Sequence, residues 1–133
     1  MPNYSGMSKH VLFDAEAITA GNTADSGIIR MRHGLGSTLS WLITQAGTVS
    51  VTFSYRISYS QSDIPDSASD ITDWSDFIDI TTSAAGNFGN DSGQWDAKII
   101  SLVDGGLVQF RATETGSAQT ATVTCYLIIS GLS

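Results

Sequence analysis

The chain has 133 residues, which is enough for one domain with a buried core but not for two. Charged residues make up only 14% of it, against about 25% in an average globular chain. The formal net charge is −7, and the six basic residues are scattered along the sequence. This composition argues against nucleic acid or an anionic membrane as a partner, because phosphate groups are bound by clustered Lys and Arg.

Cys125 is the single cysteine, so no disulfide can form within the chain. It lies in an apolar segment, where a cysteine is usually a small buried hydrophobic residue. The N-terminus lacks the basic start and apolar run of a signal peptide, and no segment has the roughly 20 apolar residues of a membrane span. We expect a soluble chain with a flexible arm at residues 1–8 and one domain at residues 9–133.

Segments with strand character follow one another along the whole chain. The clearest is residues 49–59, where apolar residues alternate with Ser, Thr and Arg. Its apolar side consists of Val49, Val51, Phe53, Tyr55, Ile57 and Tyr59. The other segments, in chain order, are 11–13, 28–32, 38–44, 77–82, 95–102, 107–115 and 120–129. Residues 15–20 fit either a continuation of the first strand or a helical turn.

Short segments rich in Gly, Asn and Ser separate these strands. Residues 21–26 form a turn-rich break. Ala46-Gly47-Thr48 is short enough to join residues 38–44 and 49–59 as an antiparallel hairpin. Residues 60–76 form a long polar connection, and a loop of that length is usually functional or disordered.

About seven to eight strands without helical periodicity predict an all-β fold, a single antiparallel β-sandwich that is jelly-roll-like or immunoglobulin-like. Trp41 shares a strand face with Leu39 and Ile43 and is expected in the core. Residues 126–129 are apolar on both faces. That pattern indicates either a central strand or a strand covered by a neighbouring subunit.

The long connection is rich in aspartate and contains no Lys or Arg. Such a loop can supply the oxygen ligands that Ca²⁺ takes in proteins. The candidate ligands are Asp63, Asp66, Asp70, Asp73 and Asp76. Their spacing matches no calcium motif, so a solvated acidic loop or a subunit contact is the favoured interpretation, with calcium as the alternative. No other cofactor is expected.

Three residues are candidate contacts to a ligand or a partner. Trp74 and Trp95 lie at junctions between loops and strands, where an exposed ring can hold a sugar but more often covers the end of a core. Arg56 is the only charge on the polar side of residues 49–59 and is a candidate for packing against a neighbour.

The sequence contains no catalytic motif. It has no Gly-x-Ser-x-Gly elbow, no His-Glu-x-x-His and no phosphate-binding glycine loop. His10 and His33 are far apart in the sequence and have no metal-ligand pattern around them. We therefore expect a protein that is not an enzyme.

The layout from Ser37 to Ser130 resembles small β-sandwich proteins of tailed bacteriophages. The segments that carry the resemblance are 38–43, 47–55, 73–76, 110–113 and 121–127. The Asp-rich insertion at residues 62–73 departs from that pattern, which has a shorter loop there. The resemblance implies a virion structural protein, namely a capsid decoration (cement) protein, a head fibre or a tail component.

Capsid decoration is the leading version of this function. The resemblance then implies contacts with the major capsid protein or other virion proteins, and a homo-oligomer with a trimer favoured. The implied location is the virion, assembled in the host cytoplasm. The alternative is a carbohydrate- or receptor-binding module of a tail or fibre, in which Trp74, Trp95 and the acidic loop would form the site.

Overall fold

A computed structural model gives the arrangement of the chain. It describes residues 8–31, 36–44, 49–59, 65, 67–84, 95–100, 106–116 and 119–130, without the side chains of 36, 82–84 and 130. Of the arm expected at residues 1–8, residues 1–7 lie outside the described residues, as do the acidic candidates Asp63 and Asp66, and Ser8 is the first residue of a strand.

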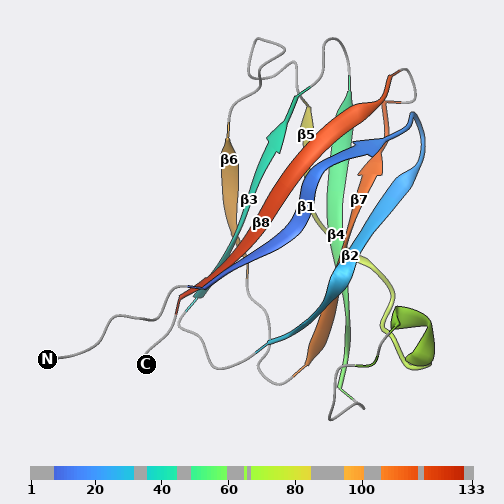
Figure 1. Ribbon diagram of the computed structural model, residues 1–133, viewed down its shortest axis with the longest axis vertical. Helices are drawn as coiled ribbons and strands as arrows, with labels where there is room; N and C mark the ends of the chain where they lie inside the picture. The colour runs from blue at the N-terminus through green and yellow to red at the C-terminus, as the bar shows by residue number, and fades with distance from the viewer. Residues whose placement is uncertain are drawn as a thin grey trace, which may run out of the picture.

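The described chain forms two four-stranded antiparallel sheets that pack face to face, which confirms the predicted all-β sandwich. Sheet A has the order β1-β8-β3-β6 and sheet B has the order β2-β7-β4-β5. The strands are β1 (Ser8–Ile18), β2 (Thr23–Arg30), β3 (Gly36–Ile43), β4 (Ser50–Ser58), β5 (Ile78–Ala84), β6 (Asp96–Ile100), β7 (Leu107–Glu114) and β8 (Ala121–Ser130). Figure 1 shows β8 and β1 of sheet A running diagonally across the strands of sheet B.

The strand order is that of a jelly roll. β1 pairs with β8, β2 with β7, β3 with β6 and β4 with β5, so the chain is a long double-stranded ribbon that is bent at β4 and β5 and rolled up. The predicted hairpin between residues 38–44 and 49–59 is wrong. β3 lies in sheet A and β4 in sheet B, and the connection between them crosses from one layer to the other.

The first quarter of the chain decides one open alternative and corrects one boundary. Residues 15–18 continue β1, which is the first of the two expected alternatives, with an irregular register between Phe13 and Glu16. β2 begins at Thr23, inside the segment that was expected to be a turn. The pairing of residues 23–25 with β7 overrides the low strand preference of Asp25, as tertiary context often does.

The core lies between the two sheets and follows the alternation of the strands. In β4, Val51 and Phe53 are buried, as predicted, with Val49 just before the strand. β8 and β3 supply the opposite wall, where Trp41 packs its ring on Phe53 with the centroids 5.1 Å apart. Fully burying each large apolar side chain contributes about 1.5–3 kcal/mol. The sandwich therefore depends on these inner faces.

The position of β8 explains its apolar sequence in part. It is a central strand of sheet A, between β1 and β3, which is the first of the two predicted explanations. Its inner residues, such as Cys125 and Leu127, are completely buried, whereas Tyr126 and Ile128 on the outer side are only partly covered. Packing in the core therefore does not explain why the outer side of β8 is apolar.

The edge of the sandwich at β5 and β6 is closed by a charged side chain. Lys98 pairs with the buried Leu39 and so stands on the inner side of β6. Its Nζ donates a hydrogen bond of 2.9 Å to the backbone carbonyl oxygen of Ile80 in the opposite sheet. A charged residue that points inward on a short edge strand opposes the addition of another strand to that edge.

One buried carboxylate holds three connections together. Glu114 is only 1% exposed, and its Oε1 accepts a hydrogen bond from the backbone N–H of Gly21. Its Oε2 accepts from the N–H groups of Ser50 and Gly116, at 3.1 and 2.7 Å. These charge-assisted bonds link the turn after β1, the start of β4 and the turn after β7.

We predict that Glu114→Gln lowers the free energy of unfolding by about 2 kcal/mol, because an amide turns an N–H₂ group toward a buried N–H donor and leaves that donor unsatisfied. Urea unfolding followed by circular dichroism measures the change. Asp79→Asn, the same exchange at an exposed position of β5, is the matched control and is expected to have little effect. Equal stability of the two variants would contradict the role assigned to Glu114.

We also predict that Cys125 does not react with thiol reagents in the folded protein. The side chain is completely buried in the core, as the sequence indicated, and desolvation raises the pKa of its thiol well above the ordinary value. Labelling with Ellman's reagent should proceed only as fast as the chain opens, and at once in denaturant. Fast labelling without denaturant would show that the strand is more accessible than described.

Candidate functional site

The two outer faces of the sandwich differ in chemistry. Alternation along the strands places every second residue of sheet A outward, and many of these residues are apolar. We call the set Val11, Leu42, Trp95, Ile99, Tyr126 and Ile128 the apolar face. Ile99 is 79% exposed, Val11 54% and Trp95 48%. Contiguous exposure of large apolar side chains indicates a contact surface, whereas single exposed ones are ordinary.

An aromatic ladder crosses the apolar face. Trp95, just before β6, stacks on Tyr126 of β8 with ring centroids 5.2 Å apart and an interplanar angle of 24°. Lys9 of β1 places its Nζ 4.5 Å from the centre of the Tyr126 ring on the other side. The ladder thus holds Trp95 in one orientation while leaving about half of it exposed.

The outer face of sheet B carries a different cluster, which we call the cation–aromatic stack: Arg56, Trp74, Phe77 and Arg111. Arg56 places its Cζ 4.5 Å from the centre of the Trp74 ring and 4.9 Å from that of Phe77. Arg111 packs on Phe77 at 3.8 Å. Rings and guanidinium groups are therefore layered, an arrangement in which each cation contributes about 0.5–1 kcal/mol at a partly exposed site.

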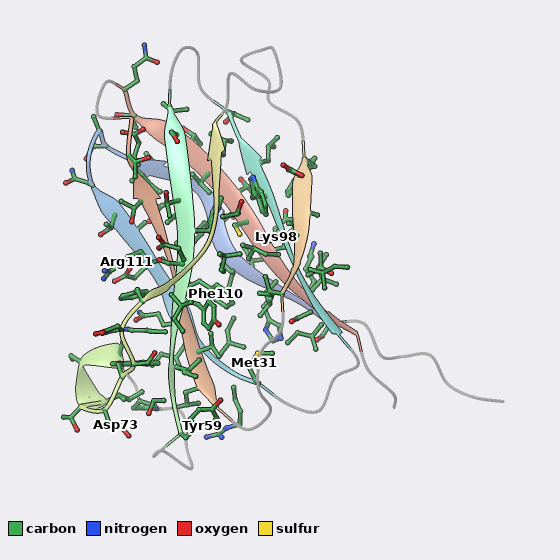
Figure 2. All side chains as sticks on the ribbon, turned by 180° about the vertical axis from the view of Figure 1, so that it is seen from behind. Met31, Tyr59, Asp73, Lys98, Phe110 and Arg111 are labelled. Atoms are coloured by element: carbon green, nitrogen blue, oxygen red, sulfur yellow. The ribbon has the colours of Figure 1, made fainter. Side chains whose placement is uncertain are left out.

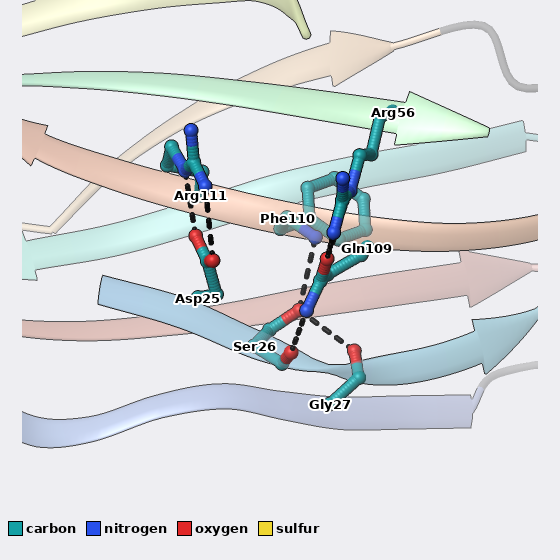
Figure 3. A network of polar contacts seen from close by, with 7 residues as sticks. All are labelled: Asp25, Ser26, Gly27, Arg56, Gln109, Phe110 and Arg111. Atoms are coloured by element: carbon teal, nitrogen blue, oxygen red, sulfur yellow. Dashed lines mark hydrogen bonds and ion pairs between the residues drawn. The ribbon is translucent and has the colours of Figure 1, made fainter. Parts of the chain in front are cut away.

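Hydrogen bonds to neighbouring strands hold the guanidinium groups of the two arginines in place (Figure 3). Arg111 donates to both carboxylate oxygens of Asp25, at 2.7 and 3.0 Å. Arg56 donates through Nε and Nη2 to the side-chain oxygen of Gln109. Gln109 in turn donates to the backbone oxygen of Ser26, so the network ties β4 and β7 to β2.

The two guanidinium groups have opposite electrostatic surroundings. The hydrogen bond to Asp25 raises the pKa of Arg111 above its ordinary value. Burial lowers the pKa of Arg56, the nearby Asp25 carboxylate raises it in part, and the charge of Arg111 lowers it further. Both groups remain cations at neutral pH, since a guanidinium group is not deprotonated in proteins.

The stack fastens the acidic connection to sheet B. Ser58 donates through Oγ to the carboxylate of Asp73. The backbone N–H of Ser75 donates to the carbonyl oxygen of Ile57, and the Oγ of Ser75 accepts from the N–H of Ile57. The indole N–H of Trp74 donates to the backbone oxygen of Ala68 in the short 3-10 helix Ala68–Asp70. Figure 2 shows Asp73 beside that helix and Tyr59 at the same end of the sandwich.

The predicted contact residues therefore fall into two places. Arg56 and Trp74 come together in the cation–aromatic stack, where Arg56 packs on its own chain. Trp95 lies on the outer side of the opposite sheet. The structure does not bring Trp74 and Trp95 together into one sugar-binding platform, because the sandwich separates them.

The calcium candidates are only partly described. Asp70, Asp73 and Asp76 lie in the described connection, and Asp73 accepts the hydrogen bond from Ser58. Within the described ranges no three His, Cys, Asp or Glu side chains are grouped so that they could hold a metal ion. Calcium binding by a set that includes Asp63 and Asp66 stays a prediction.

Sequence reasoning missed most partners of the two clusters. Phe77 and Arg111 were placed in strands, but the contact between them depends on a register that the sequence does not reveal. Ile99 and Val11 were placed in strands without a face, and the register of β6 and β1 at the edges of sheet A turns both side chains outward. The one available signal was the apolar outer side of β8.

Comparison with known protein families finds no match, and comparison with curated proteins finds no similar sequence. In the described part of the chain, no helix has the length and apolarity needed to cross a membrane.

We predict that Arg56→Lys lowers the free energy of unfolding by about 1 kcal/mol, because an ammonium cannot stack between two rings and donate twice to Gln109. The same change in a Trp74→Leu background isolates the contact with the indole. A double-mutant cycle by urea unfolding should give a coupling energy of about 0.5 kcal/mol or more. Additive effects would show that the stack does not fasten the connection.

Proposed function

We propose that this protein is a non-enzymatic virion structural protein of a tailed bacteriophage, with capsid decoration as the leading version. The observation that carries the proposal is the apolar face. Exposed Ile99, Val11 and Trp95 gather on one sheet and are not part of the core cluster between the sheets. A surface of this kind gains free energy when another protein covers it, at about 25 cal/mol for each Å² of apolar area removed from water.

The geometry favours contact through a face rather than through an edge. The edge at β6 carries the inward Lys98, which opposes strand addition. The apolar face lies on four hydrogen-bonded strands and carries few charges, so it can be covered with little desolvation of ions. A rigid sandwich with one apolar face suits a protein that reinforces a shell by many repeated contacts.

The buried reactive groups support a structural role. Glu114 uses its carboxylate to join three connections, and Cys125 is enclosed in the core. Asp25 and Arg111 neutralise each other on the surface. Each of these groups therefore has a structural partner or setting, as expected for a protein that acts by binding.

A carbohydrate- or receptor-binding module is the second candidate. The observation that favours it is the stacked pair Trp95 and Tyr126, which presents an ordered and half-exposed ring. Sugars stack on such rings through their apolar C–H faces. In this version the site is Trp95 and Tyr126 with neighbouring hydroxyl groups, and Trp74 plays no part.

The first test is the composition of phage particles. Particles from the organism that carries the gene, purified on a density gradient, should contain the chain by mass spectrometry. A Val11→Glu chain, expressed in place of the native one, should be reduced at least tenfold on the particles. Tyr59→Glu is the matched control, because Tyr59 is also 54% exposed but lies outside the apolar face.

Glycan-array screening separates the two functions. Binding of a glycan that is lost in Trp95→Ala, together with particles that lack the chain, would overturn the decoration proposal in favour of the second candidate. Particles that contain native and Val11→Glu chains equally would remove the apolar face from the contact.

A further inference from the structure

The register of sheet A arranges the outer side chains in three rows that cross the strands. The first row is Lys9, Ile128, Thr38 and Ile99, each paired with the next. The middle row is Val11, Tyr126, Ser40 and Ala97. The third contains Thr124 paired with Leu42, with Ala15 bound to Thr124 on one side and Trp95, two residues before Ala97, on the other.

The first and third rows are complementary to each other. At the β1 side, the first row has the exposed cation Lys9, and the third has exposed Asp14 next to Ala15. At the β6 side, the first row has Ile99 and the third has Trp95, two of the most exposed apolar residues. The middle row between them is uncharged.

From this arrangement we infer that the apolar face binds a second copy of this chain across a two-fold axis that runs along the middle row. Such an axis, lying between two sheets packed face to face, keeps β1 over β1 and β6 over β6 but reverses the strand direction. The first row of one copy then lies over the third row of the other. Lys9 faces the partner's Asp14, and Ile99 packs on the partner's Trp95.

The positions of the end charges favour a second copy as the occupant. Each chain carries a formal charge of −7, so association between copies is repulsive over most of their surface. The apolar face is the part where two copies meet without opposing carboxylates, and the two-fold axis turns its end charges into two opposite-sign pairs. A partner of another sequence would need its own anion, cation and apolar groups at the facing positions, whereas a second copy supplies them by symmetry.

This inference rests on the proposed contact surface and assigns it to a second copy. The chain would then join a particle as a dimer, and Val11→Glu would lower its amount there by breaking the dimer. The two-fold arrangement differs from the three-fold arrangement that the phage resemblance favours, in which the apolar face of one copy would meet a different surface of the next. The two arrangements predict different masses and different neighbours for each residue of the middle row.

The first measurement is the mass in solution. Size-exclusion chromatography with light scattering should show a mass that rises with concentration to that of a dimer. Val11→Glu should weaken association by about tenfold or more, because it places two carboxylates at the axis. Tyr59→Glu should leave it unchanged, and circular dichroism checks that both variants are folded. A monomer at all concentrations, or a trimer, overturns the inference.

The second measurement tests the axis. Side chains on the middle row meet their own copies, whereas those of the first row do not. Packed sheets lie about 10 Å apart, so a short bismaleimide should cross-link Ala97→Cys chains into dimers. It should leave Ile99→Cys chains, two residues away on the same strand, largely uncoupled. The buried Cys125 does not compete. Equal coupling at both positions contradicts the axis.

Charge reversal tests the end pairs. Lys9→Glu and Asp14→Lys should each weaken the dimer several-fold, and the double variant should restore it, because the pair is then re-formed with opposite orientation. If the dimer of the double variant is weakened by the sum of the two single effects, the pairing is contradicted. A monomer that still decorates particles would sink this inference alone, whereas a dimer absent from particles would sink the proposed function alone.

Discussion

The structure depends on the packing of two alternating strand faces against each other. β4 and β7 of sheet B and β3 and β8 of sheet A each turn every second side chain into the core between the sheets, and Trp41 against Phe53 joins the two walls. Replacing such a large residue with alanine costs about 3–5 kcal/mol, a large part of the 5–15 kcal/mol that stabilises a typical domain. Because this alternation fixes the inner faces, it also decides which side chains are left outside.

What is left outside divides the molecule into two surfaces. On sheet B, arginines stack on Trp74 and Phe77 and bind Asp25 and Gln109, so the polar groups satisfy one another and fasten the acidic connection. On sheet A, the outer side chains have few partners within the described chain. The outer side of sheet A thus carries few charged side chains. A protein with one face of paired polar groups and one apolar face is suited to lie on a neighbour in a fixed orientation.

The sequence predicted the fold class and most strands because alternation and turn residues are local signals. It placed Trp41 and Cys125 correctly in the core for the same reason. It failed where a result depends on pairing between distant segments. Residues 38–44 and 49–59 looked like a hairpin but lie in different sheets, and residues 23–25 looked like part of a turn but pair with β7. Arg56 and Trp74 were named as candidate contacts to a ligand or a partner, but their contact with each other was not predicted. Ile99 could not be recognised as exposed, because only its position on an edge strand makes it so.

The central claim is that the apolar face is covered in the working state of the protein. Hydroxyl-radical footprinting, read by mass spectrometry, compares the dilute chain with the assembled one at single residues. The account predicts that oxidation of Trp95, Tyr126 and Ile99 falls sharply on assembly while that of Tyr59 does not change. Equal oxidation of Trp95 and Ile99 in both states would contradict it.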